Sequence, residues 1–150
     1  MRTAKAQTLV ALEPGAARDL WADPRRWASF VEGFARVREA SGDWPAAGSK
    51  LVWESIPAGR GRVTERVVED GHGSFATEVF DDSLHGTQRA SFTPEEDGTR
   101  VVVELDYDLT KYGPLKALAD VIFIRRALRD SLRRTLSRFA VEAEDEAGLR

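Results

Sequence analysis

The sequence contains no cysteine and only two histidines. Without cysteine the protein has no disulfide, no thiolate metal site and no thiol nucleophile. His72 lies in the turn-forming segment EDGHGS, and strand alternation places His85 on a solvent-facing side. Neither histidine has the serine and aspartate of a catalytic triad beside it, and two isolated histidines do not make a metal-ligand cluster. We therefore expect no metal and no cofactor, and we assign no catalytic residue.

Long apolar runs and an excess of basic residues are also missing. No run approaches the roughly 18–20 residues of a membrane span, and the N-terminal segment MRTAKAQTLV lacks the apolar core and cleavage site of a signal peptide. These absences predict a soluble, cytoplasmic protein. The formal net charge of −3 is unlike that of a nucleic-acid-binding protein, so we expect no nucleic-acid partner.

What the sequence does contain is the composition of one globular domain. Its 150 residues are 42% hydrophobic and 31% charged, enough for both a core and a solvated surface. We find no internal repeat, linker or low-complexity segment. We therefore expect a single domain, residues 1–150.

The first part of the chain is predicted to hold one strand, at 3–12, and two short helices, at 16–22 and about 24–30. Asp23 is suited to cap the second helix and Pro24 to occupy its first turn. Six further strand candidates, separated by turns rich in Gly, Pro and Asp, predict an antiparallel meander. They cover 34–40, 49–55, 62–69, 74–80, 84–93 and 99–109.

A long C-terminal helix is predicted to begin at Gly113-Pro114. Its apolar residues recur at helical spacing and form one stripe: Leu118, Val121, Leu128, Leu132, Leu136 and Phe139. Thirty residues would span about 45 Å, which is long for a small domain. We therefore expect a bend near Arg125 and Arg126, and fraying of the tail EDEAGLR.

This order of elements resembles the START-related superfamily, also called SRPBCC or birch-pollen-allergen-like. The likeness is carried by LEPGAARDLWADPRRWASFV after the first strand, GDWPAAGSKLVW before the third, and DLTKYGPLKALAD before the last helix. Within the superfamily the chain looks like the bacterial polyketide cyclase/dehydrase and lipid-transport branch. The resemblance covers nearly the whole chain.

The resemblance implies an α+β, helix-grip fold. In this fold a seven-stranded antiparallel sheet curves around the C-terminal helix, and a hydrophobic cavity lies between them. Family members bind lipids, sterols, polyketides, quinones or plant hormones, and a minority catalyse aromatisation or cyclisation. The resemblance therefore implies a hydrophobic small-molecule ligand.

Candidate ligand contacts come from the short helices and from the face of the sheet that alternation assigns to the interior. Most of that face is apolar, as a hydrophobic ligand requires. The segment LWADPRRWASFVEGF at 20–34 adds aromatic residues, which either belong to the ordinary core or line the cavity. The predicted contacts are Trp27, Phe30, Trp53, Phe75, Gln88, Phe92, Tyr107 and Arg125.

Three polar residues, Glu65, Gln88 and Arg125, fall among the apolar positions. Arg125 lies near the middle of the helical stripe, and because an unpaired buried charge is costly, it needs a partner such as Glu65, a ligand anion or a path to solvent. For Glu65 we favour a rim position open to water. Gln88 and Tyr107 are suited either to orient a carbonyl or hydroxyl of a ligand, or to bond each other or an ordered water.

Three functions follow as hypotheses. The first is a carrier or sensor that binds a lipid, polyketide or isoprenoid-like molecule. The second is a polyketide aromatase/cyclase, which needs donors aimed at developing oxyanions, and the candidates are Arg125, Gln88 and Tyr107. The third is an interaction protein that uses the arginines of the last helix or the patch VIFI at 121–124, although a solvated helix face is the favoured reading of those arginines. Phe123 points away from the apolar stripe, where it would seal a pocket mouth or form a homodimer contact.

Overall fold

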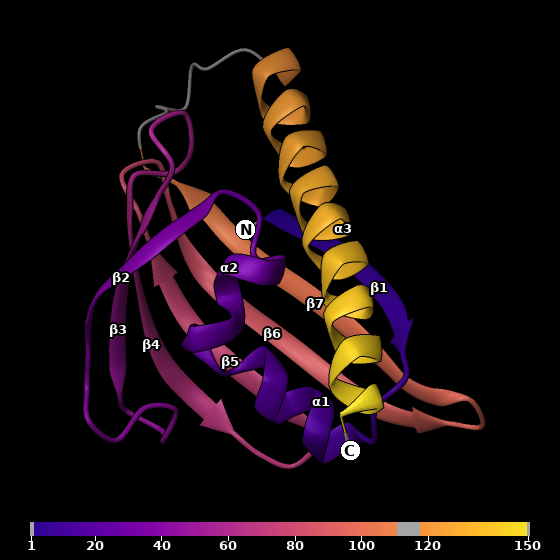
Figure 1. The fold of residues 1–150 in the computed structure, drawn as a ribbon. Helices are drawn as coiled ribbons and strands as arrows, with labels where there is room; N and C mark the ends of the chain where they lie inside the picture. Colours follow the sequence, from indigo (N-terminus) through magenta and orange to yellow (C-terminus); the bar gives the residue numbers. More distant parts are fainter. Residues whose placement is uncertain (1, 111–117, 150) are drawn as a thin grey trace.

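The chain forms a curved antiparallel sheet crossed by one long helix (Figure 1). The structure is a computed structural model that describes residues 2–110 and 118–149. The sheet has seven strands in the order β1-β7-β6-β5-β4-β3-β2. Neighbours from β2 to β7 follow one another in the sequence, so the predicted meander is confirmed. The strands are β1 Arg2–Val10, β2 Phe34–Ala40, β3 Lys50–Ser55, β4 Arg62–Asp70, β5 Ser74–Phe80, β6 Leu84–Glu95 and β7 Gly98–Leu109.

The segment between β1 and β2 forms α1 (Pro14–Trp21), a single 3₁₀ turn (Pro24–Arg26) and α2 (Trp27–Phe30). Asp23 starts the 3₁₀ turn as predicted, because its side chain accepts a hydrogen bond from the backbone N–H of Arg25 at 3.0 Å. The indole N–H of Trp27 donates to the carbonyl of Trp21 at 2.9 Å. This bond ties the two short helices together across the Asp-Pro break.

The long helix α3 covers Leu118–Gly148. Its predicted start at Gly113-Pro114 lies outside the described residues. The helix runs past Arg125 and Arg126 without a visible kink, and its N-terminal turns extend beyond the sheet (Figure 1). The predicted fraying of the tail is wrong as far as Gly148, because α3 continues to that residue and Glu146 forms an ion pair with Arg26.

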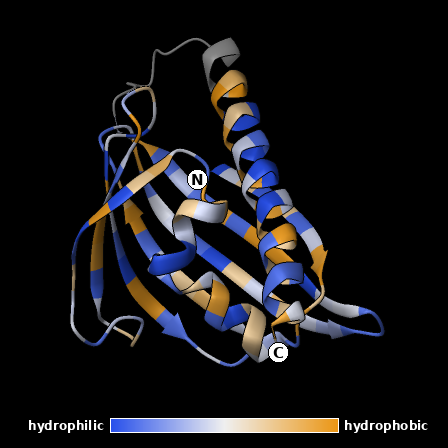
Figure 2. Cartoon of the chain, in the orientation of Figure 1, coloured by the Kyte–Doolittle hydropathy of each residue, from blue (hydrophilic) through white to orange (hydrophobic). Residues whose placement is uncertain are grey.

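The core lies between the concave face of the sheet and the helices. Hydrophobic and hydrophilic residues alternate along the strands (Figure 2), and in β7 the buried positions are occupied by Thr99, Val101, Val103, Leu105 and Tyr107. Phe139 of α3 completes the core where its ring meets Phe30 at 4.9 Å and Trp21 at 5.3 Å between centroids. No helix in the described part of the chain is both long and apolar enough to cross a membrane.

Candidate ligand-binding site

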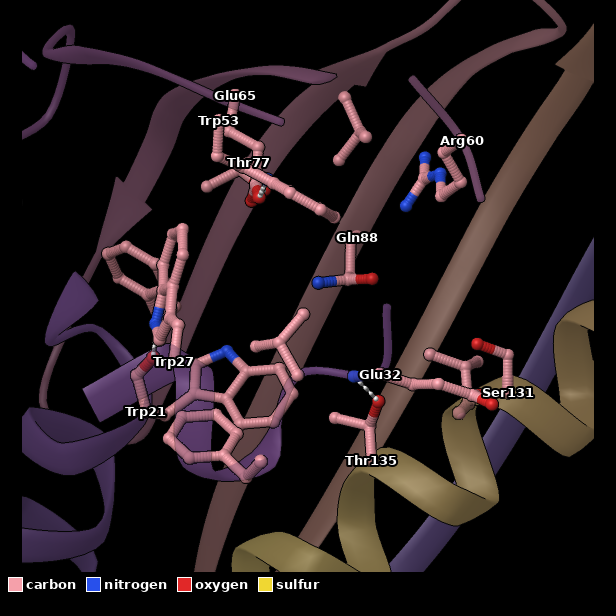
Figure 3. Close-up of a pocket in the computed structure, with 15 residues that line it drawn as sticks. Trp21, Trp27, Glu32, Trp53, Arg60, Glu65, Thr77, Gln88, Ser131 and Thr135 are labelled. Atoms are coloured by element: carbon pink, nitrogen blue, oxygen red, sulfur yellow. Dashed lines mark hydrogen bonds between the residues drawn. The ribbon is translucent and has the colours of Figure 1, made fainter. Parts of the chain in front are cut away.

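A cavity lies between the concave face of the sheet, the short helices and α3 (Figure 3). Its enclosed part has a volume of about 70 Å³. It continues into an open groove of about 700 Å³ between α3 and the β3–β4 loop, residues 56–61. The enclosed part and the groove share the lining residues Val31, Glu32, Trp53, Arg60 and Ser131. Among the residues that the structure describes, the cavity is therefore a partly closed space that opens into a broad groove.

Aromatic side chains form most of the apolar wall. Trp27 and Phe30 come from the short helices, and Trp53 and Phe75 come from the sheet. The local bond between Trp27 and Trp21 fixes one side of this wall. Four of the predicted contacts, together with Gln88 of β6, thus line a single cavity. Their role in binding remains a prediction.

Glu65 of β4 also lines the cavity, and the rim position favoured from the sequence is wrong. The residue is only 9% exposed. One carboxyl oxygen accepts the indole N–H of Trp53 at 2.7 Å, and the other accepts the hydroxyl of Thr77 at 3.0 Å. Burial raises the pKa of the Glu65 carboxyl, and these two bonds and the charge of Arg60 oppose the rise only in part.

Arg60 is a cavity residue that sequence reasoning missed. It lies in the β3–β4 loop, and its Nε donates to a carboxylate oxygen of Asp81 at 2.7 Å. The Asp81 side chain is fully buried. Burial acts to raise the pKa of Asp81, but the charge of Arg60 and the backbone N–H groups of Ser83 and Leu84 outweigh it, so the pKa lies below its usual range. The segment GRGR at 59–62 was the only sequence signal, and it has no periodicity to show which arginine points inward.

A second carboxyl group enters the cavity from the segment that follows α2. Glu32 accepts a hydrogen bond from Arg134 of α3 at 2.6 Å, and its backbone N–H donates to the hydroxyl of Thr135 at 3.0 Å. These two contacts join the end of α2 to the middle of α3. They place Glu32 at the boundary between the enclosed cavity and the groove.

The other three predicted contacts lie away from this cavity. Phe92 and Tyr107 are buried in the core, and Tyr107 packs with Leu128 of α3. Arg125 is exposed, and it does not pair with Glu65, whose nearest cationic group is Arg60. The helical stripe predicted an inward position for Arg125, but the residue is exposed, and its charge lies close enough to Tyr107 of β7 to oppose the rise in the pKa of Tyr107 that burial causes.

The described residues hold no group of three or more histidine, aspartate or glutamate side chains suited to bind a metal. What the cavity does offer is an aromatic wall, an amide from Gln88, a buried carboxyl from Glu65 and a guanidinium from Arg60. These groups can hold an apolar molecule and form hydrogen bonds with its oxygen atoms.

The curved sheet, the long helix across it and the cavity between them define a helix-grip protein of the START-like class. The chain belongs to the family described as polyketide cyclase/dehydrase and lipid transport, whose model matches residues 1–144. The predicted fold and the predicted family are both confirmed.

Solved structures share this fold with little sequence identity. A START superfamily protein from Mycobacterium smegmatis is 14% identical over 95% of this chain and 97% of its own, with a TM-score of 0.75. A protein from Thermus thermophilus is 17% identical over 97% of this chain and 99% of its own, with a TM-score of 0.76. No curated protein matches the chain.

The di-domain ARO/CYC StfQ from the steffimycin biosynthetic pathway also has this fold. It is 16% identical over 97% of this chain, with a TM-score of 0.78. The chain spans only 51% of StfQ, so it is similar to about half of that protein.

Proposed function

We propose that the protein binds a hydrophobic small molecule, such as a lipid, polyketide or isoprenoid-like compound, as a carrier or sensor. The observation that carries this proposal is the aromatic wall formed by Trp27, Phe30, Trp53 and Phe75, which leads from an enclosed cavity into an open groove. All four side chains are 5% exposed or less, so the apolar wall is already formed by the fold and a ligand in the cavity would lie against it. The family description, which includes lipid transport, supports the same function.

The size of the cavity sets the way in which a ligand would bind. An engineered apolar cavity of about 150 Å³ binds benzene, and the enclosed space here is about 70 Å³. Only one end of a ligand therefore fits inside without movement of side chains. The rest of the molecule would lie in the groove against α3, where about 700 Å³ is open.

Two serines of α3 provide a matched test of this proposal. Ser131 lines both the cavity and the groove, whereas Ser137 is exposed on the outer side of the same helix. We expect Ser131→Trp to reduce the affinity for N-phenyl-1-naphthylamine, a neutral fluorescent probe, at least tenfold, because the indole would fill the entrance. Ser137→Trp should bind as the wild type does. Titration by fluorescence, with native mass spectrometry against a lipid extract, measures both.

The proposal fails if the wild-type protein neither binds the probe nor retains any lipid in native mass spectrometry. It also fails if both tryptophan variants bind the probe as tightly as the wild type does, because the probe would then bind somewhere else on the surface.

A second candidate function, a polyketide aromatase/cyclase, is favoured by one observation. Glu65, whose pKa is raised by burial, and Arg60 line the same cavity. A carboxyl with a raised pKa can serve as a general acid or base, and a guanidinium can stabilise a developing oxyanion. The likeness to half of StfQ, an ARO/CYC protein, supports this function. Glu65→Gln should then abolish turnover of a poly-β-ketone thioester while N-phenyl-1-naphthylamine still binds. Equal turnover by variant and wild type would rule it out.

Two further expectations remain predictions. One is the cytoplasmic location. The other is a homodimer contact through Phe123, which is 71% exposed beside the groove. Because Phe123 lies at the entrance, such a contact and ligand entry would compete for the same surface.

A further inference from the structure

The guanidinium of Arg60 is held along one edge only. Its Nε donates to Asp81, and the other oxygen of Asp81 accepts the backbone N–H and hydroxyl of Ser83 at 2.8 and 2.9 Å and the N–H of Leu84 at 3.0 Å. Asp81 is therefore a fixed anchor. Nη2 of Arg60 is buried and has no hydrogen-bond partner among the residues that the structure describes.

A buried guanidinium N–H without an acceptor is unfavourable, and proteins rarely leave one unexplained. Arg60 lines the cavity wall, and Figure 3 shows its guanidinium directed toward the same space as the amide of Gln88. Neither side chain bonds the other, and no hydrogen bond of the Gln88 amide occurs within the described ranges. Arg60 and Gln88 therefore bring polar groups from the loop and from β6 to the same cavity, and Nη2 of Arg60 is a donor without a partner there.

The charges around this point disfavour an anion. The positive charge of Arg60 is already compensated by the carboxylate of Asp81 at 2.7 Å. Glu32 adds a second carboxylate to the same cavity, and its partner, Arg134, is exposed. The carboxyl of Glu65, whose pKa is raised by burial, adds no positive charge that would attract an anion. A negatively charged ligand group would meet these carboxyls in a space of low dielectric, where repulsion is strong. A neutral oxygen atom can accept a hydrogen bond from Arg60 without that repulsion.

We propose that Arg60 and Gln88 form a subsite for a neutral oxygen acceptor, such as a ketone or quinone oxygen, of a ligand whose apolar rings lie against Trp27 and Trp53. This subsite would select such ligands over fatty acids and other carboxylates. The inference rests on the proposed binding function and adds to it the chemical class of the ligand.

Three probes of similar shape test the subsite. 2-Acetylnaphthalene has a ketone oxygen, 2-isopropenylnaphthalene has a CH₂ group in its place, and 2-naphthoate has a carboxylate. Displacement of N-phenyl-1-naphthylamine from the wild-type protein at pH 7.5 gives the three affinities. We expect the ketone to bind roughly tenfold more tightly than the hydrocarbon, because a hydrogen bond to a charged donor is gained. The carboxylate should bind more weakly than the ketone.

Variants of Arg60 and Gln88 show whether these two residues cause the preference for the ketone over the hydrocarbon. In Arg60→Met the ketone should lose its advantage while the affinity for the hydrocarbon stays within about twofold, since the aromatic wall that contacts the hydrocarbon is unchanged. The substitution also removes the ion pair with Asp81, so its effect on folding is measured separately. Gln88→Leu should lose part of the advantage, about threefold. Arg62→Met is the matched control, because Arg62 is exposed at the start of β4, two residues from Arg60, and it should keep the full preference. The hydrocarbon affinity and far-UV circular dichroism report whether each variant is folded.

Should Arg60→Met fail to fold, Arg60→Lys keeps a positive charge for Asp81 but loses the planar second edge, and it should also lose most of the ketone advantage. The proposal is overturned if the wild type binds the hydrocarbon and the ketone equally well, if the carboxylate binds most tightly, or if Arg62→Met removes the preference as fully as Arg60→Met does. In each of these cases the hydrocarbon still binds and the proposed binding function stands. If none of the three probes binds the wild type, both proposals fail together.

Discussion

Glu65 is an ionisable side chain buried in the cavity wall beside aromatic residues. Its two hydrogen-bond donors, Trp53 and Thr77, come from the adjacent strands β3 and β5, and each lies diagonally opposite Glu65. Trp53 is paired with Val63, and Thr77 is paired with Val67, so both flank Glu65 on the concave face of β4. Their two donors make burial of the carboxyl tolerable, because each oxygen has a partner.

The raised pKa of Glu65 has a defined effect on stability. Above the ordinary value of 4.5, the folded protein keeps a proton on Glu65 that the unfolded chain has released. In that range the free energy of unfolding falls as pH rises, and the loss is complete once pH exceeds the raised pKa. Glu65→Gln has no such proton. Relative to wild type, the variant should therefore become more stable as pH rises above 4.5, by up to about 1.4 kcal/mol per pH unit.

Urea denaturation between pH 4 and about 8.5 measures this difference. The glutamine side chain has a single acceptor oxygen and can satisfy only one of the two donors, so a constant loss of about 0.5–1.5 kcal/mol is expected at every pH. Thr77→Val removes one donor and keeps the carboxyl. The free energy of unfolding of this variant should therefore still depend on pH as that of the wild type does. A constant difference between Glu65→Gln and wild type at all pH values would show that Glu65 has an ordinary pKa.

Individual site residues were predictable only where a pattern reports the direction of a side chain. Strand alternation placed Trp53, Phe75 and Gln88 on the concave face, and they line the cavity. It also put Glu65 on that face, but its partners depend on strand register, which alternation does not give. Arg60 lies in a loop with no period. Arg125 falls on the helical stripe, yet it is exposed and lies near Tyr107, and helical period alone does not show how a long side chain is directed.

At the scale of elements, the pairing of β6 with β7 depends on how closely their two backbones approach each other at Gly86. Gly86 of β6 is paired with Tyr107 of β7, and a Cβ at this glycine would stand 2.0 Å from the backbone oxygen of Asp106. A side chain there would force the two strands apart. The glycine thus keeps β6 close to β7 beside Tyr107, at the end of the sheet near Leu84.

Two glycine-to-alanine variants should have opposite effects on stability. Gly86→Ala should lower the free energy of unfolding by about 1–3 kcal/mol, because the backbone must move to admit the methyl group. Gly15→Ala in α1 has open space around the new Cβ, and it should raise the free energy by about 0.5–1 kcal/mol, because alanine favours a helix. Urea denaturation at one pH measures both. A neutral Gly86→Ala would mean that the two strands are not held at this spacing.

The elements themselves were more predictable than the site. The turns rich in Gly, Pro and Asp separated all of the strands, and the predicted strand at 34–40 has the observed bounds. The first strand ends at Val10 rather than at residue 12, because Leu12 is buried in the connection to α1. The tail of α3 was predicted to fray because chain ends are commonly poorly ordered. Its ion pairs with Arg26 come from a segment more than a hundred residues earlier, which local pattern cannot show.

In the whole molecule, packing is concentrated at one half of α3. The C-terminal half places Leu136, Phe139 and Ala143 in the core against the sheet and short helices. Toward the N-terminal end, Ile122 and Phe123 are 52% and 71% exposed, and the helix borders the groove. The molecule therefore has a firmly packed end and an end at which a ligand could enter.

Two phenylalanines of α3 test this division. Phe139→Ala should lower the free energy of unfolding by about 3–5 kcal/mol, because a fully buried ring is lost from contact with Trp21 and Phe30. Phe123→Ala should change it by less than about 0.5 kcal/mol, because the ring is mostly in solvent. Urea denaturation measures both values, with the same helix and the same substitution in each case.

Hydrogen exchange in the native protein gives the same comparison without a variant. Backbone amides of residues 122–128 should exchange through local opening at a lower free energy than those of 135–143, because fewer buried contacts must be broken. Addition of 2-acetylnaphthalene should slow exchange at 122–128 and leave 135–143 nearly unchanged, since a ligand in the groove would cover only the first half. Equal protection along the helix, or equal losses from Phe123→Ala and Phe139→Ala, would mean that α3 is held uniformly and that the groove does not open at its N-terminal end.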